Sequence, residues 1–493
     1  MPIPFNEVPA NTRLPWVYVE FDASQAVQGP QLLAYKGILI GQKTSAGTQA
    51  ALTPARITSA DQAARLFGVG SVLHNMAQAW FASNTFTEVW AVAFADPGAG
   101  VAATSTITFT GAPTESGTYT LYIAGRRVQV GITAAMTVTQ MATAAAAAIN
   151  LVTDLPVTAT SAVGVVTLTA KHKGLFTNDI TITDNFFGEK TPAGMVSTPT
   201  QPSGGTGLPD LTTLWPVLGD TFYNIWTSPY NDTASLADAN AQLLVRSGPT
   251  RQVDAVQFNG IKGTFSTVTA FGEGQNKQFV NFMATQQSPS PSYEWGAETA
   301  AIAANYGQRD PARPFQTLAY SWVKSPILAN RFIQSERNLC LFSGISTFHV
   351  GPDGLPVIDR LITSYQQNNN GAEDTAYMDL NTILTLSYLR YDFRNHILRK
   401  YPRHKLANDG TKYGAGQPIV TPKVIKAECI AKFREWEYIG LVEGMEQFKR
   451  DLIVERNVTD PTRLDIYLPP DLINQLIVVG VQIGFRLQSI SID

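Results

Sequence analysis

The end of the chain carries its clearest alternation of apolar and polar positions. Over residues 475–493, every second residue from Ile477 to Leu487 is apolar, and from Gly480 onward polar or small residues lie between them. The phase then changes, because Ile490 and Ile492 are apolar and their neighbours are serines. A period of two is typical of a β-strand with one buried face, and a shift of one residue moves every side chain to the opposite face.

Two interpretations fit this change of phase. One is a β-bulge near the end of an ordinary edge strand. The other is a strand whose first part completes its own sheet and whose last residues add to a sheet in another subunit. The second is favoured, since a long exposed strand with unpaired backbone groups invites association. The N-terminus offers a similar element, because prolines exclude a helix there and Trp16–Asp22 alternates in the same way.

The middle of the chain alternates buried strands with amphipathic helices. Residues 37–41 and 89–92 are apolar runs separated by helical patterns, which predicts a parallel crossover. The same pattern resumes after residue 206 and includes a hairpin of Leu339–Val350 with Leu355–Thr363. Between these parts, residues 101–205 are rich in threonine and alanine and alternate with a period of two. They predict a β-rich domain inserted into the α/β unit.

The last third of the chain predicts helices followed by short strands. A helix is expected over 381–400, and a second one begins at Thr421-Pro422, with an N-cap followed by a proline in the first turn. The predicted fold is an α/β core with an inserted β-rich domain and a C-terminal α+β domain carrying extended N- and C-terminal strand arms. The expected parts are an arm at 1–30, a core at 31–100 and 206–370, an insert at 101–205, a C-terminal domain at 371–474, and a strand and arm at 475–493.

Composition and charge exclude several classes of function. The net charge is −3, so no global field draws the chain to nucleic acid. Charged residues make up only 15% of the chain, which suits a protein whose faces are covered by other subunits. No apolar run is long enough to span a membrane, and no signal peptide is expected. Two cysteines are too few for a disulfide framework.

No catalytic or cofactor motif emerges from the sequence. The chain lacks a phosphate-binding loop, a dinucleotide fingerprint, HExxH, CxxC and GxSxG. His396 and His404 flank the end of a predicted helix and make a poor metal pair. Glu435 and Glu437 lie two residues apart, so they point to different sides of their helix. We therefore expect no catalytic residue, no cofactor and no metal, and a protein that is not an enzyme.

Long stretches of the chain resemble the contractile tail sheath proteins of Mu-like bacteriophages. The resemblance lies in residues 360–410 and 416–457, in LPPDLINQLIVVGVQIGF near the end, and in RLPWVYVEFD and LFGVGS…EVWAVAF near the start. It covers essentially the whole chain and is weakest at 103–200. Because these are long matches, the resemblance is more specific than a short motif.

This resemblance implies a structural subunit in the tail of a virion, assembled in the cytoplasm of the host bacterium and made late in infection. Such subunits stack as hexameric rings into a helical sheath around an inner tail tube. Contraction of the sheath drives the tube through the host envelope for genome ejection. The implied partners are other sheath subunits, the tail tube protein, the baseplate and the tail terminator, with no nucleic acid and no membrane insertion.

Two sets of residues follow as candidates. The resemblance implies that the arms add strands to neighbouring subunits, through Trp16, Val17, Tyr18, Val19, Phe21, Phe485, Leu487, Ile490 and Ile492. It also implies that the C-terminal domain faces the tube, where complementary charge would give a separable contact. The basic residues predicted for that contact are Lys423, Lys426, Lys432 and Arg434.

Two alternatives stay open at this point. The first is the sheath of a bacteriocin or of another contractile injection system, which the residues do not separate from a phage sheath. The second is a surface adhesin or glycan-binding protein, suggested only by the threonine-rich insert. An adhesin predicts a signal peptide or an aromatic binding platform, and the sequence shows neither.

Overall fold

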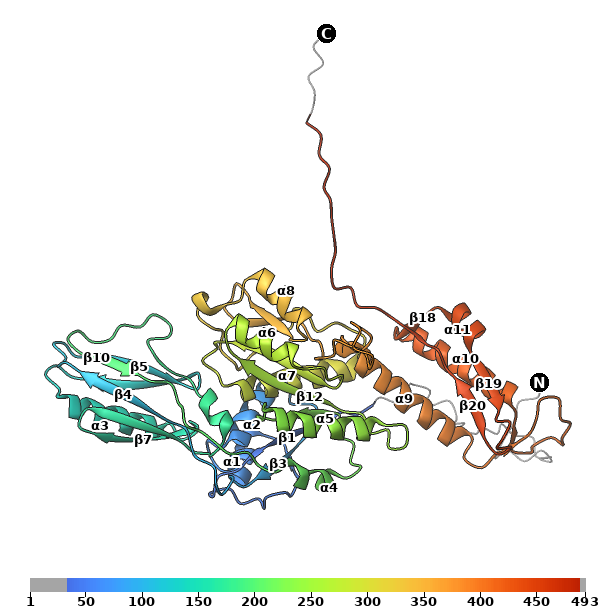
Figure 1. Ribbon diagram of the computed structural model, residues 1–493, viewed down its shortest axis with the longest axis horizontal. Coiled ribbons are helices and arrows are strands. Elements are labelled where there is room, and N and C mark those ends of the chain that lie inside the picture. The colour runs from blue at the N-terminus through green and yellow to red at the C-terminus, as the bar shows by residue number, and fades with distance from the viewer. Residues whose placement is uncertain (1–32, 488–493) are drawn as a thin grey trace, which may run out of the picture.

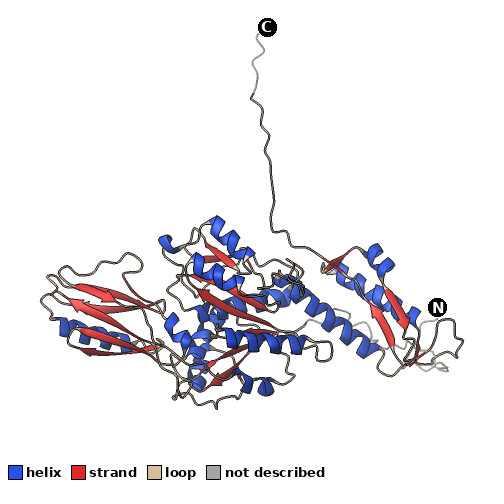
Figure 2. Ribbon diagram, viewed as in Figure 1, coloured by secondary structure: helices blue, strands red, loops and turns tan. Residues whose placement is uncertain are grey.

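The computed structural model describes residues 33–487 and has a mixed α/β architecture with several sheets. It is elongated, with a parallel sheet and its helices in the middle (Figure 1). The region between residues 101 and 205 lies at one end, and the last helices lie at the other end (Figures 1 and 2). The domain boundaries drawn from the sequence remain predictions.

A six-stranded sheet forms the centre of the molecule, in the order β13-β12-β11-β1-β3-β2. Neighbouring strands are parallel except for β2, which runs antiparallel to β3 at the edge. The crossover predicted from the first two apolar runs is present, because β1 and β3 pair in parallel along seven positions. The strands are β1 (Lys36–Gln42), β2 (Ala55–Ile57), β3 (Glu88–Phe94), β11 (Ile225–Thr227), β12 (Val256–Lys262) and β13 (Val280–Gln286).

Helices cover this sheet, and side chains cap several of them. Ser59, Ser71, Asp232 and Thr264 each accept a hydrogen bond from a backbone N–H in the first turn, which satisfies a donor that the helix leaves free. The alanine-rich α7 is buried along most of its length, as expected for a helix inside a core. The helices are α1 (Ala60–Phe67), α2 (Val72–Ser83), α4 (Trp215–Leu218), α5 (Thr233–Ser247), α6 (Phe265–Glu273), α7 (Ser292–Arg309) and α8 (Gln334–Phe342).

The predicted hairpin after residue 339 is only partly correct. Residues up to Phe342 continue helix α8, and the hairpin consists of β14 (Thr347–Val350) and β15 (Pro356–Arg360). Gly344 lies at a φ of +72°, a conformation that favours glycine, so the chain turns there before the first strand begins. The apolar run from Leu339 therefore spans two elements.

The inserted region has its own apolar core, separate from that of the central sheet. Its strands form one sheet in the order β10-β4-β8-β7 and another in the order β6-β5-β9. The elements are β4 (Thr104–Thr110), β5 (Gly117–Ile123), β6 (Arg126–Ile132), α3 (Val138–Leu151), β7 (Val157–Ala162), β8 (Val165–Ala170), β9 (Ile182–Asp184) and β10 (Val196–Pro199).

The C-terminal region is built on two long helices, both close to their predicted positions. Buried residues of α9 and α10 belong to the same apolar cluster as the central sheet, so the core runs on into this region. Short strand pairs β16·β17, β18·β21 and β19·β20 surround the helices. The elements are α9 (Leu380–Lys400), β16 (Lys405–Leu406), β17 (Ile419–Val420), α10 (Pro422–Tyr438), β18 (Val442–Glu443), α11 (Met445–Asp451), β19 (Ile453–Arg456), β20 (Leu464–Tyr467) and β21 (Asp471–Leu472).

Candidate assembly surfaces

The segment from residue 477 to 487 extends away from the body of the subunit (Figure 1). Its last contacts with the body are two side-chain hydrogen bonds. Gln475 Nε2 donates to the Ala312 carbonyl and Gln316 Nε2 donates to the Leu476 carbonyl, each at 3.1 Å. Beyond this point Ile483 is 83% exposed, and Phe485 and Leu487 are similarly exposed. We call residues 477–487 the tail. Ile477 is half-buried, and from Val479 onward the apolar row is exposed within the described subunit.

This geometry corrects one expectation from the sequence. We expected the first part of the closing strand to complete the sheet of its own domain. Instead, the last strand in the described part of the chain is β21, which ends at Leu472 and pairs with β18. Residues 473–487 are assigned to no strand. The alternation that predicts a buried face is present, but no surface among residues 33–487 buries it.

The other predicted arm residues lie outside the described residues. These are Trp16, Val17, Tyr18, Val19 and Phe21 at the start, and Ile490 and Ile492 at the end. Only Phe485 and Leu487 of that set can be placed, and both belong to the exposed row.

The hairpin β19·β20 has two edges that pair with no other strand of the described chain. Val454 and Ile466 are opposite each other and pack against the main apolar core. On the other face, Ile453 and Tyr467 are also opposite each other and are largely exposed. Unpaired edges with an anchored apolar face are suitable for receiving further strands. The sequence predicted these strands but gave no sign of which edges would be free.

The four predicted tube-contact residues lie on α10 in different environments. Lys432 is buried, with its Nζ 2.8 Å from Asp392 Oδ2 and 2.7 Å from Glu435 Oε2. Trp436 Nε1 donates to the same Asp392 oxygen at 2.7 Å. This group joins α10 to α9 inside the subunit. Lys432 is therefore a structural residue in the described subunit and is a poor choice for a contact with a separate protein.

The remaining three basic residues are more accessible. Lys423 and Arg434 are exposed on α10. Lys426 is half-buried, and its Nζ donates to the Leu452 carbonyl at 2.8 Å, which ties α10 to the segment before β19. The sequence could place these residues on one helix, but it could not show which side chains already have partners. Lys423 and Arg434 are the members of the set that remain available.

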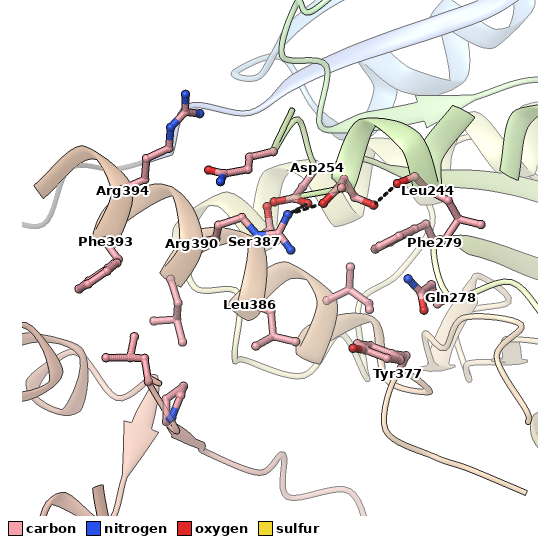
Figure 3. A pocket seen from close by; sticks show the side chains of 17 residues that line it. Leu244, Asp254, Gln278, Phe279, Tyr377, Leu386, Ser387, Arg390, Phe393 and Arg394 are labelled. Carbon is pink, nitrogen blue, oxygen red and sulfur yellow. Dashed lines mark hydrogen bonds and ion pairs between the residues drawn. The ribbon is translucent and has the colours of Figure 1, made fainter. Parts of the chain in front are cut away.

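A pocket of about 700 Å³ lies where α9 meets the central sheet (Figure 3). Arg390 crosses this junction, and its Nη1 lies 3.0 Å from Asp254 Oδ1 and 2.6 Å from the Ser247 carbonyl. Leu386 and Phe393 also line the pocket from α9 (Figure 3). Arg390 therefore holds the C-terminal region to the core.

Several ionisable groups between α9 and α10 form structural pairs. Burial acts to raise the pKa of Glu428, but hydrogen bonds with Lys400 (2.7 Å) and His396 (3.0 Å) outweigh it and lower that pKa. His404 lies against the ring of Tyr401 instead of near His396. Within residues 33–487, no group of three or more His, Cys, Asp or Glu side chains could hold a metal ion.

The two cysteines are buried and unpaired. Burial raises the pKa of Cys340 to about 12 and that of Cys429 to about 11. Both thiols thus stay protonated at neutral pH and are poor nucleophiles. No helix in the described part of the chain is both long and apolar enough to cross a membrane.

Two family models and one full-length relative match the chain. The model of the phage tail sheath protein central domain matches residues 204–364, and that of the phage tail sheath C-terminal domain matches residues 372–486. The Mu-like prophage FluMu tail sheath protein of Haemophilus influenzae is 38% identical over 488 residues, which cover 99% of this chain and 100% of the relative. The chain belongs to the phage tail sheath family. It is a structural subunit of a contractile tail sheath and a component of a phage tail.

Solved structures of sheath proteins are more distant in sequence. A sheath tail protein from Desulfitobacterium hafniense is 12% identical, with a TM-score of 0.48 over 93% of this chain and 100% of that chain. A sheath tail protein from Listeria innocua is 11% identical, with a TM-score of 0.46 over 88% and 91%. The helical sheath of the anti-feeding prophage in its contracted state is 10% identical, with a TM-score of 0.46 over 98% and 100%. These likenesses are too weak to add to the family match.

The family match bears on the tail and on the insert of this sheath protein. The matched C-terminal sheath domain extends to residue 486 and so includes nearly all of the exposed tail. The full-length relative spans 99% of the chain, so the match is not confined to the parts outside the insert. A separate adhesin is therefore not needed to explain residues 101–205.

Proposed function

We propose that this sheath subunit joins to its neighbours through its tail, and that the joined subunits stack as hexameric rings around an inner tail tube. Contraction of this polymer then drives the tube through the host envelope. The observation that carries the proposal is the uncovered apolar row of the tail in a chain of the sheath family. The polymer assembles in the host cytoplasm and meets the baseplate at one end and the tail terminator at the other.

The free energy available to the tail favours a shared strand. Six apolar side chains, at every second position from Ile477 to Leu487, would be covered in a neighbouring sheet. Each contributes about 1.5–3 kcal/mol on burial as an upper estimate, and each backbone hydrogen bond adds roughly 0.5–1.5 kcal/mol. Ordering the tail opposes this gain. The net free energy of burial and hydrogen bonding, less the cost of ordering, favours a strand that stays bound when the bodies of two subunits move relative to each other.

The hairpin β19·β20 is the proposed acceptor of these strands. Its two unpaired edges offer one place for the tail of one neighbour and another for the N-terminal segment of a second neighbour. In such a sheet the apolar row continues the layer of Val454 and Ile466, which already packs on the subunit core. Donation in one direction from subunit to subunit closes into rings or continues as a helix, according to the rotation between copies.

The tube contact is proposed for the exposed basic residues of α10. Lys423 and Arg434 have no ion-pair partner among the described residues. A complementary acidic surface on the tube would attract them without permanent bonds, because exposed charge pairs are individually weak and screened by salt. A sheath that slides off its tube during contraction needs a contact of this kind.

Growth of the sheath on purified tail tubes tests this function. We expect the wild-type subunit to form sheaths on tubes, and the double variant Lys423→Glu, Arg434→Glu to fold normally but to form far fewer of them. Counting sheathed and bare tubes in electron micrographs gives the measurement. The matched control is Lys449→Glu on α11, an accessible lysine away from α10 that pairs only with Glu446 of its own helix. Equal coverage by the double variant would reject the proposed tube contact.

A further inference from the structure

The inserted region meets the core through buried charged groups at its base. Because β11 pairs directly with β1, the central sheet continues past the point of insertion. The insert, which begins after β3, has a separate apolar core and therefore does not need the core to fill its interior. Its orientation on the core must come from the contacts at its base, which combine buried polar groups with the ring of Phe176, packed edge-on against Tyr230 and Tyr293 of the core.

Arg126 is the centre of this junction. It begins β6 of the insert, and its side chain is only 12% exposed. Its Nη1 lies 2.9 Å from Glu294 Oε1 on α7, and its Nη2 donates to Gln78 Oε1 on α2 at 2.8 Å. Its Nε lies 3.3 Å from Asp154 Oδ2 of the insert. One planar guanidinium therefore joins the insert to two helices of the core, with each donor in a fixed direction.

The core side of the junction is held rigidly. Glu294 is 1% exposed, and its second oxygen accepts a hydrogen bond from Trp322 Nε1 at 2.8 Å. The guanidinium of Arg126 also lies over the Trp322 ring, 5.4 Å from its centre. One turn along α7, buried Glu298 accepts backbone N–H groups of residues 321–323. These bonds hold the loop that carries Trp322 without involving Arg126.

Burial has opposite effects on the two partners of this junction: it raises the pKa of Glu294, although Arg126 acts to lower it. Burial is the largest single effect and acts to lower the pKa of Arg126, but Glu294, Tyr293 and Asp154 together outweigh it and raise that pKa above its ordinary value. The guanidinium therefore stays charged. A buried charged pair of this kind contributes little net stability but restricts geometry, since any other arrangement leaves a charge without a partner.

Further polar contacts surround Arg126 at the same interface. His172 of the insert accepts the backbone N–H of Val72 at 3.1 Å, and its other ring nitrogen lies 2.8 Å from Asp96. Lys262, at the end of β12, donates to Thr181 Oγ1 of the insert at 2.6 Å. These bonds lie around the central group on different elements, which resists both tilting and rotation of the insert.

We propose that Arg126 is the positioning residue that fixes the orientation of the inserted region on the core. The proposal goes beyond the sheath function, since it concerns how the inserted region is oriented relative to the core. With the junction intact, the insert turns with the core as one body. Without it, the insert stays folded on its own apolar core but samples several orientations.

Distances between spin labels test this proposal in the full chain. One label is placed on the insert at Ser161→Cys and one on α5 at Ala237→Cys, which are exposed positions, while the two native cysteines are buried. Labelled subunits are diluted into an excess of unlabelled protein so that only distances within one subunit are measured. We expect one narrow distance distribution in the parent protein and a distribution at least twice as wide with Arg126→Met.

Two further variants make the result decisive. Arg127→Met is the matched control, because Arg127 is the next residue of β6 and is half exposed; it should leave the distribution narrow. Trp322→Phe removes one hydrogen bond to Glu294 without removing a charge, and should widen the distribution to a smaller extent. If Arg126→Met does not fold, the width of the distance distribution in Trp322→Phe tests the proposal instead. A parent distribution that is already broad, or narrow distributions in both junction variants, would overturn the proposal.

Discussion

At the scale of single residues, His74 shows how burial links this subunit to pH. His74 lies in the first turn of α2, and its Nδ1 accepts the backbone N–H of Gly70 at 3.0 Å. Burial lowers its pKa to about 4, and the nearby positive charge of Arg126 acts in the same direction. The neutral ring is therefore favoured in the folded protein, while the unfolded chain takes up a proton near pH 6.5.

The sign of the resulting pH dependence follows from this difference. Above pH 6.5 the ring is neutral in both states, and His74 has no effect on stability. As the pH falls from 6.5 to 4, the unfolded chain is protonated first, so the folded state loses up to about 3 kcal/mol. Urea unfolding of the subunit between pH 7 and pH 4 measures the loss. The control is His74→Asn, whose amide oxygen can accept the same hydrogen bond without titrating. If the two proteins show parallel pH curves, His74 is not the cause.

Residues that act within one element could be predicted from the sequence, while residues that act between elements could not. Thr421 and Pro422 were predicted to begin a helix, and Thr421 Oγ1 accepts the Val424 N–H as an N-cap should. Lys432 was predicted to be a surface residue, because a lysine on a predicted helix is expected to face solvent when its partners on other elements are unknown. Its partner Asp392 lies on α9, and nothing in the sequence links the two positions.

At the scale of elements, the contact between α9 and α10 depends on a buried ion pair. Lys432 and Asp392 are both nearly inaccessible, and Trp436 completes the hydrogen bonding of the carboxylate. We expect Lys432→Met to lower the free energy of unfolding by about 3 kcal/mol, since it leaves a buried carboxylate without its counter-charge. Urea unfolding of the purified subunit checks this value.

An exposed lysine on the same helix gives the comparison. Lys423→Met should change the free energy of unfolding by less than about 0.5 kcal/mol. Equal effects of the two substitutions would contradict the assignment of Lys432 to the interior. A loss of sheath assembly by Lys432→Met alone would report unfolding, so it would say nothing about the tube.

Helices and buried strands were predicted well because each carries its signal locally, in caps and in the spacing of apolar residues. The tail shows where this reasoning fails. Its alternation predicts a strand with a covered face, and this stays a prediction, because alternation does not say which sheet supplies the cover. The β18·β21 pair ends the home sheet at Leu472, and the apolar row begins only after that point.

At the scale of the whole molecule, rigid and extended parts are clearly separated. The central sheet, α9 and α10 share one continuous apolar core, and the insert is joined to them by the Arg126 junction. The tail instead leaves this body with its apolar side chains uncovered (Figure 1). We infer that contacts between the bodies of neighbouring subunits change during contraction, while the tail keeps each subunit bound to its neighbour.

The most direct test of this account is electron microscopy of the purified protein expressed alone, with a pair of tail variants. Ile483→Asp places a charge in the apolar row, where a neighbouring sheet would bury it at high cost. Gln482→Asp changes the adjacent residue on the other face. Both positions are exposed in the subunit, so neither substitution should unfold it. We predict hollow, regularly striated tubes from the wild-type protein and from Gln482→Asp, and folded monomers from Ile483→Asp. Normal tubes from Ile483→Asp, or persistent monomers of the wild-type protein at high concentration, would contradict the account.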